Sequence, residues 1–150
     1  MAVDHERAQV YAAERSAFEG TTIEEIIPFA DVVAAADRLT SSSTWSMGRI
    51  KVVAARTDAS SSTTVWRPHD PPTVRITRPQ QTLGTLVHEM AHVLAGRDAG
   101  HGPKFRRAHL DITSALIGDD AAEWLDEAYR THGLGIGERR WPRCTLGIAL

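Results

Sequence analysis

The stretch His88-Glu89-Met90-Ala91-His92 is the most informative part of this 150-residue chain. In an α-helix, residues four positions apart lie one turn apart on the same face, so His88 and His92 would present both imidazoles together. With about 100° of rotation per residue, Glu89 falls on that same side of the helix. The apolar residues around the motif form a separate stripe: Leu83, Leu86, Val87, Met90 and Leu94. The pattern predicts a helix that buries one stripe and presents two histidines and a glutamate on another.

Two imidazoles at this spacing can share one Zn²⁺, and Glu89 between them can act as the base that orients and deprotonates water. Nine positions after His92, a third histidine opens the sequence His101-Gly102-Pro103-Lys104-Phe105. Three protein ligands leave one position open to water, as in catalytic rather than structural zinc sites. We therefore predict His88, His92 and His101 as zinc ligands and Glu89 as the general base.

The third ligand is the least constrained of these assignments, because its distance from His92 is not fixed by one helix. Glycines at 96, 100 and 102 allow the chain to turn back, and Pro103 favours the start of a new helix. The competing ligands are Asp98, His109 and Asp111. Asp98 lies too close to the end of the motif helix to fold back easily, and the other two lie further along the next helix.

Several other residues have both a functional and a structural interpretation, and the structural one is favoured for each. His109, Asp111 and Glu123 could each support the metal ligands, for example by a hydrogen bond that orients an imidazole. We expect instead that His109 lies on the surface and that the two carboxylates have no role at the metal. Tyr11 and Tyr129 are conceivable hydrogen-bond donors to a transition state, but core positions are expected. Solvated positions on a helix face are expected for Lys104, Arg106 and Arg107, and core positions for Trp45, Trp66 and Trp124.

Composition restricts the class of protein. The chain is 42% hydrophobic and 24% charged with a formal net charge of −2, which is typical of a globular domain and gives no general case for binding nucleic acid or anionic membranes. No apolar run reaches the length of a membrane span, and the charged start from Met1 to Glu19 lacks a signal-peptide core. The one cysteine, Cys144, excludes a disulfide framework. A cytoplasmic location is expected.

Hydrophobic periodicity predicts helices near 4–18, 29–39, 79–95, 103–116 and 121–132, with strands at 49–54, 64–66 and 73–77. This order predicts an α+β fold in which a small three-stranded sheet packs on the motif helix. We expect the sheet to be mostly antiparallel with mixed pairing, because the connections between strands are too short for crossover helices. We expect one domain over residues 1–150, with a metal-site core at about 45–132 and an unassigned tail at 133–150.

The stretch from Thr85 to His92, followed by His101-Gly102-Pro103-Lys104-Phe105, resembles the SprT-like (Spartan-like) metallopeptidases of the zincin class and, less closely, the related WLM group. A group of small bacterial metallohydrolases without assigned substrates is also similar. The resemblance extends from about Trp45 to Ile117 and is specific only between Leu83 and Phe105. It implies a zincin-like fold, the same three zinc ligands and Glu89 as catalytic base. One cysteine cannot form the zinc ribbon that often follows the SprT-like core, and the mild acidity gives no support for a role on DNA.

These observations predict a zinc-dependent hydrolase and favour a metallopeptidase that cleaves a peptide or protein substrate with zinc-activated water. The strand at Val74 to Thr77, if it is a sheet edge, would hold the substrate in extended form. One alternative is a zinc-dependent hydrolase of another bond, such as an endoribonuclease, although Glu89 beside the first histidine favours a peptidase. Another is a catalytically silent, zinc-folded binding module.

The ligand assignment predicts different effects for two histidine variants. His101→Ala removes one of three ligands and should lower zinc affinity at least about tenfold. His109→Ala should leave bound zinc near one equivalent per chain. Titration of the purified variants with zinc in the presence of a competing chelator measures both, and the opposite result would show that the ligand set is wrong.

Overall fold

The computed structural model describes residue 4 and residues 6–146. Residues 1–3, 5 and 147–150, which include the end of the predicted 133–150 tail, lie outside the described residues. The helices are α1 (Arg7–Phe18), α2 (Phe29–Thr40), α3 (Leu83–Ala95), α4 (Pro103–Leu116) and α5 (Asp119–Thr131). The strands are β1 (Lys51–Ala54), β2 (Thr63–Val65) and β3 (Thr73–Ile76). Short 3₁₀ helices are η1 (Thr22–Glu24), η2 (Arg78–Gln80) and η3 (Arg97–Ala99). The predicted α+β class is confirmed.

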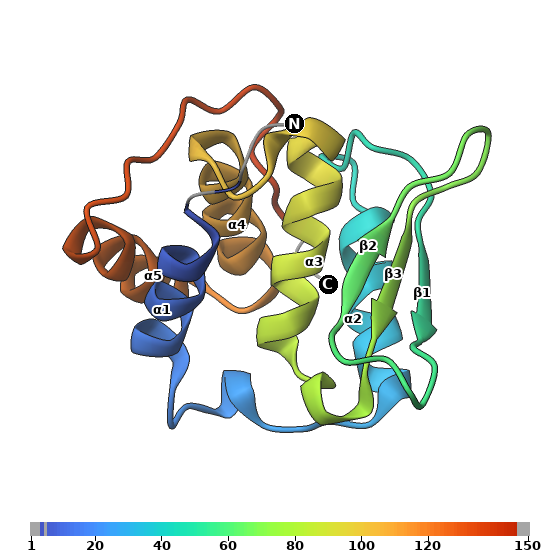
Figure 1. The fold of residues 1–150 in the computed structure, drawn as a ribbon. Coiled ribbons are helices and arrows are strands. Elements are labelled where there is room, and N and C mark those ends of the chain that lie inside the picture. Colours follow the sequence, from blue (N-terminus) through green and yellow to red (C-terminus); the bar gives the residue numbers. More distant parts are fainter. Residues whose placement is uncertain (1–3, 5, 147–150) are drawn as a thin grey trace.

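Helix α3 carries the motif and runs through the middle of the molecule, with the sheet and α2 on one side and α1, α4 and α5 on the other (Figure 1). The sequence predicted its start near Pro79. Pro79 instead lies in η2, and α3 begins at Leu83 because the Thr82 hydroxyl accepts a hydrogen bond from the Thr85 backbone N–H at 3.1 Å.

Both faces of α3 are covered. Its apolar stripe enters the core, where Leu86, Val87 and Met90 have no exposed surface. The stripe that carries the motif is also buried, with His88 and Glu89 only 4% and 5% exposed. Because α3 is enclosed, its polar side chains must find partners inside the protein, and those partners define the site.

The sheet is mixed, which corrects the mostly antiparallel sheet predicted from the sequence. Its strand order is β1-β3-β2, with β1 and β3 parallel and β2 and β3 antiparallel. The connections are indeed too short for a crossover helix. However, β2 runs antiparallel to β1 and returns the chain to the end of the sheet where β1 begins. Strand β3 can then lie between β1 and β2 and run parallel to β1.

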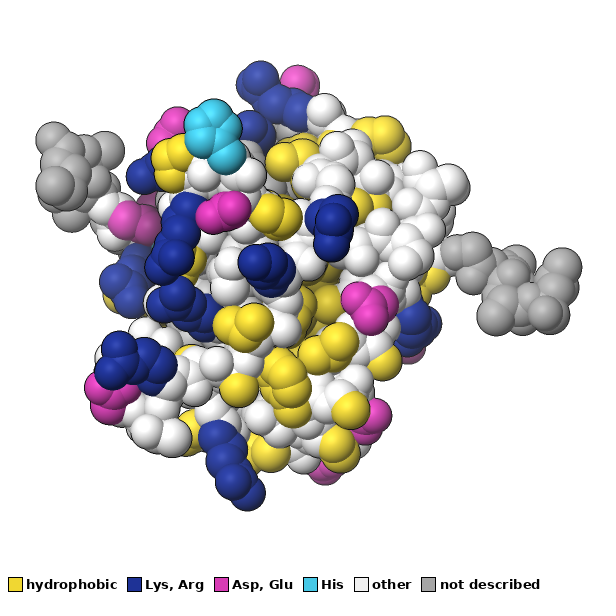
Figure 2. All heavy atoms as spheres, turned by 90° about the vertical axis from the view of Figure 1, so that its right-hand side faces the viewer, with side chains coloured by type: hydrophobic (Ala, Val, Ile, Leu, Met, Phe, Trp, Pro, Cys, Tyr) yellow, Lys and Arg dark blue, Asp and Glu magenta, His cyan; other side chains and the backbone are white. Residues whose placement is uncertain are grey.

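The strand at Val74 to Thr77 could hold a substrate only as a sheet edge, and this topology does not meet that condition. Strand β3 is central, and β2 is the edge strand beside α3. The inward side chains of β3, Val74 and Ile76, are buried against the helices. On the outward face, Lys51 is exposed on β1 and Arg75 is partly exposed on β3. Figure 2 shows Lys and Arg side chains gathered beside hydrophobic ones when the molecule is viewed from the sheet side.

The segment after α5, which had no predicted structure, packs back onto α4. Arg139 donates two hydrogen bonds to the Asp111 carboxylate at 2.6 and 2.8 Å, and the Trp141 indole N–H donates a third at 2.9 Å. Cys144 is buried nearby, where burial raises the pKa of its thiol to about 11. Asp111 therefore holds the C-terminal segment in place.

Among the described residues, no helix is long and apolar enough to cross a membrane.

Removal of the Asp111 carboxylate should cost more stability than removal of a surface carboxylate. Asp111→Ala leaves Arg139 and Trp141 without their acceptor and should lower the free energy of unfolding by about 2 kcal/mol. Asp126→Ala, which removes the exposed pair with Arg130, is the matched control and should change it by less than about 1 kcal/mol. Urea denaturation measures both, and equal losses would contradict this account.

Candidate metal centre

Three imidazoles converge at one point. His88 and His92 come from successive turns of α3, and His101 comes from the turn between η3 and α4. One ring nitrogen from each of the three lies within 4.8 Å of the others. The chain reverses through Gly96 and Gly100, whose φ angles of 98° and 55° are in the range that favours glycine. The sequence-predicted ligand residues are therefore side by side, and together they form a group that can hold a metal ion.

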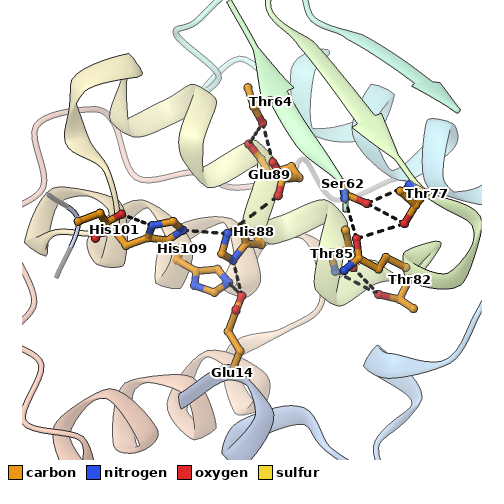
Figure 3. Close-up of polar contacts among 12 residues, drawn as sticks. Glu14, Ser62, Thr64, Thr77, Thr82, Thr85, His88, Glu89, His101 and His109 are labelled. Carbon is orange, nitrogen blue, oxygen red and sulfur yellow. Dashed lines mark hydrogen bonds and ion pairs between the residues drawn. The ribbon is translucent and has the colours of Figure 1, made fainter. Parts of the chain in front are cut away.

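The outer nitrogens of two of these rings face carboxylates. His88 Nδ1 lies 2.6 Å from Glu14 Oε1, and His101 Nδ1 lies 2.5 Å from Asp4 Oδ2. A carboxylate accepts hydrogen bonds, so each Nδ1 carries the proton and donates it. The Nε2 atoms of His88 and His101 then face each other at 3.2 Å (Figure 3). Two nitrogen lone pairs at this distance repel unless a cation lies between them, either a proton or a metal ion.

The charges of the three rings fit this arrangement. Burial alone would lower the pKa of His88, but the Glu14 carboxylate outweighs it, and the pKa is raised. For His101, burial lowers the pKa despite the hydrogen bond to Asp4. For His92, burial and the neighbouring imidazoles lower the pKa to about 2. His92 and His101 are therefore neutral at neutral pH, which is the form that binds metals.

Glu89 lies beside the cluster without joining it. Its Oε2 is 4.0 Å from His88 Nε2, and its Oε1 is 3.0 Å from the Thr64 hydroxyl. The same hydroxyl lies 3.1 Å from the Glu89 carbonyl oxygen, so one proton serves two acceptors. Burial raises the pKa of the Glu89 carboxyl. A carboxyl with a raised pKa, held next to three imidazoles, is suited to accept and return a proton.

The donor set fits a zinc ion. Zinc is bound in catalytic sites by three protein ligands, and neutral imidazole nitrogen is a preferred ligand. The hydrogen bonds from His88 to Glu14 and from His101 to Asp4 have the form of the carboxylate–histidine pairs that orient metal ligands. The ring of Phe105 packs against all three histidines, so one side of the cluster is apolar.

Sequence reasoning did not identify Glu14 or Asp4. Both come from the N-terminal part of the chain, 74 and 97 residues from the histidines they contact. A signal for Glu14 was present, because Arg7, Tyr11 and Glu14 lie at helical spacing among apolar neighbours. Tyr11, expected in the core, is 40% exposed, and its ring stacks on His88 with centroids 5.2 Å apart.

His109 lies in a different environment from the one predicted. It was expected on the surface, but it has no exposed area. Its Nδ1 lies 2.6 Å from the hydroxyl of Tyr129, which is buried as predicted, and its Nε2 lies 3.3 Å from Glu14 Oε1. Burial lowers the pKa of His109 to about 3 despite the nearby Glu14 carboxylate, so the ring is neutral. The cause is its position on α4, one turn after Phe105, where it points toward α1 and α5.

The other candidates lie apart from the cluster. Asp98 and Glu123 are exposed, and Asp111 contacts the C-terminal segment. Arg106, expected on a solvated face, is 2% exposed and donates hydrogen bonds to Glu6 and to the carbonyl oxygens of His101 and Gly135. Trp124, expected in the core, is 46% exposed.

A cavity of about 450 Å³ opens onto this site. His88 and Glu89 line it together with Tyr11 and Glu14 on the α1 side and Ser62 on the side of the β2 edge. Thr85, one turn before Glu89 on α3, also lines it. The cavity gives an extended ligand a route between α1 and the sheet edge to the motif side chains.

The buried histidines predict how the stability of the metal-free protein depends on pH. The folded-state pKa values of His92 and His109, about 2 and about 3, lie below the unfolded value of 6.5, so protonation favours unfolding as pH falls. His101 acts in the same direction, whereas the raised pKa of His88 opposes it. The free energy of unfolding should therefore fall by roughly 1 to 3 kcal/mol per unit between pH 6.5 and 5.

Urea denaturation of chelator-treated protein at pH 7, 6 and 5 measures this dependence. His109→Gln removes one of the titrating groups and should reduce the slope. Stability that is constant or increases on acidification would contradict the assignment of neutral, buried imidazoles.

Comparison of the chain with models of known protein families, with curated proteins and with solved structures finds no match. The function of the site is therefore inferred from the chemistry of its own residues.

Proposed function

We propose that this protein is a zinc-dependent metallopeptidase. The observation that supports the metal site most directly is the pair of Nε2 atoms on His88 and His101, 3.2 Å apart, each turned inward by a carboxylate on its Nδ1. His92 adds a third neutral nitrogen from the next turn of α3. The presence of Glu89 beside this cluster, not as one of its donors, favours hydrolysis over purely structural metal binding.

His88, His92 and His101 would hold the ion. Zinc supplies a Lewis acid that polarises a carbonyl group and lowers the pKa of water. Glu89 accepts the proton from the attacking water and passes it to the leaving amine, and the raised pKa of its carboxyl suits both transfers. The Thr64 hydroxyl holds Glu89 in position and links its carboxylate to β2.

We place the substrate along the edge of β2. This strand pairs with β3 along one edge, and its Thr64 side chain contacts α3, so its other edge can accept an extended peptide as an added strand. Ser62, just before β2, and Glu89 line the same cavity, so a peptide paired there would pass the general base. Backbone pairing of this kind favours extended or unfolded segments of a protein as substrates.

The proposal predicts that proton transfer and metal binding can be separated. Glu89→Gln retains the shape of the side chain but cannot accept the proton, so peptide hydrolysis should fall at least about 100-fold. Bound zinc should remain near one equivalent. The assay uses zinc-loaded protein with unfolded casein and a pool of fluorogenic peptides, and Glu19→Gln, an exposed carboxylate on the same protein, is the control.

Full activity in Glu89→Gln would exclude this mechanism. Cleavage of RNA but not of peptides in a parallel assay would show a hydrolase of another bond. If chelation unfolds the protein while neither substrate is cut, zinc has a structural role and the chain is a binding module.

A further inference from the structure

Behind the metal centre, a buried chain of polar contacts crosses four helices. Glu14 on α1 contacts His88 on α3 at 2.6 Å and His109 on α4 at 3.3 Å, both through Oε1. His109 in turn contacts the hydroxyl of Tyr129 on α5 at 2.6 Å. His109 and Tyr129 have no exposed surface, and the Glu14 side chain is 13% exposed. Figure 3 shows Glu14 pointing up from α1 between the rings of His88 and His109.

The direction of each contact follows from the chemistry of the groups. Glu14 accepts, so Nδ1 of His88, which is hydrogen-bonded to it, carries a proton. The negative charge of Glu14 also favours a proton on Nε2 of His109, 3.3 Å away. His109 Nε2 lies close enough for an electrostatic contact but lacks hydrogen-bond alignment. In a neutral His109, Nδ1 is then an acceptor, and the Tyr129 hydroxyl donates to it. Tyr129 thereby favours the tautomer whose N–H faces Glu14.

We propose that Glu14, His109 and Tyr129 are positioning residues that hold the ring of His88 with Nε2 directed at the metal. This inference rests on the proposed zinc site and extends it. Glu14 fixes the ring and the position of the His88 proton, while His109 and Tyr129 restrain the carboxylate from the opposite side. Asp4 does the same for His101 through a separate contact, so the two ligands are oriented independently.

The same three groups do not have the spacing of a second metal site, although Glu14, His88 and His109 lie close together. Two atoms bound to one zinc ion at about 2.0 to 2.2 Å in tetrahedral geometry are separated by more than about 3 Å. The distance from His88 Nδ1 to Glu14 Oε1 is 2.6 Å, which is that of a charge-assisted hydrogen bond. The Nε2 atoms of His88 and His101, 3.2 Å apart, do have the separation of shared ligands.

Zinc binding to the purified full chain tests the proposal without depending on activity. Glu14→Gln should weaken zinc binding by about 10- to 100-fold while leaving one equivalent bound at saturation. Glu19→Gln neutralises an exposed carboxylate next to the end of α1 and should bind zinc as the wild type does. Tyr129→Phe removes one hydroxyl, three contacts away from His88, and should weaken binding severalfold.

A second readout separates positioning from a loss of general stability. In ¹⁵N NMR spectra of the zinc-loaded wild type, His88 should be protonated at Nδ1 and metal-bound at Nε2, and His109 should be protonated at Nε2. Tyr129→Phe should convert His109 to a mixture of tautomers while the thermal transition remains cooperative. If Glu14→Gln fails to fold, Tyr129→Phe decides the question by zinc affinity and tautomer together.

Zinc binding unchanged in both Glu14→Gln and Tyr129→Phe would overturn the inference. Two zinc ions in the wild type and one in Glu14→Gln would also overturn it and show a second metal site. Neither result affects the proposed peptidase activity. Conversely, the wild type could bind one zinc ion and the variants could show the predicted losses of affinity while no peptide is cleaved. That result would support the positioning residues and contradict the proposed peptidase activity.

Discussion

Two imidazole nitrogens held face to face are the constraint on which the rest of the structure depends. Nε2 of His88 and Nε2 of His101 lie 3.2 Å apart, and hydrogen bonds to Glu14 and Asp4 keep either ring from turning away. Their lone pairs repel unless a cation lies between them, either a proton or a metal ion. The raised pKa of His88 favours the proton when no metal is bound. Burial of helix α3 in the apolar core holds the two rings in this position.

The burial of α3 also explains the many polar contacts around the motif. A helix in the middle of a small protein cannot leave imidazoles and a carboxylate unpaired, because an unsatisfied buried polar group costs about 1 to 3 kcal/mol. Each motif side chain that is buried has a partner on another element: Glu14 for His88 and Thr64 for Glu89. The partners hold the motif in one geometry, which is also the requirement for catalysis.

The sheet has a smaller share of the core but determines access to the site. Strand β3 runs between β1 and β2, and Thr64 on β2 contacts Glu89 on α3. The cavity that reaches His88 and Glu89 is bounded by α1 on one side and by the residues before β2 on the other. The mixed topology therefore places a free strand edge and a proton acceptor next to each other.

The sequence by itself determined the features that arise within one or two turns of chain: the five helices to within a few residues, the three short strands, and the placement of His88, His92 and Glu89 on one helical stripe. Helical periodicity and glycine conformations depend on neighbouring residues, so they can be predicted from a single sequence. Only the tertiary structure decided what lies opposite that stripe. Glu14, Asp4 and Tyr129 come from distant parts of the chain, and the burial of His109 and the exposure of Trp124 depend on how α4 and α5 pack. Strand order likewise depends on pairing across long separations, which short strands do not encode because their side-chain pattern is nearly the same for parallel and antiparallel neighbours.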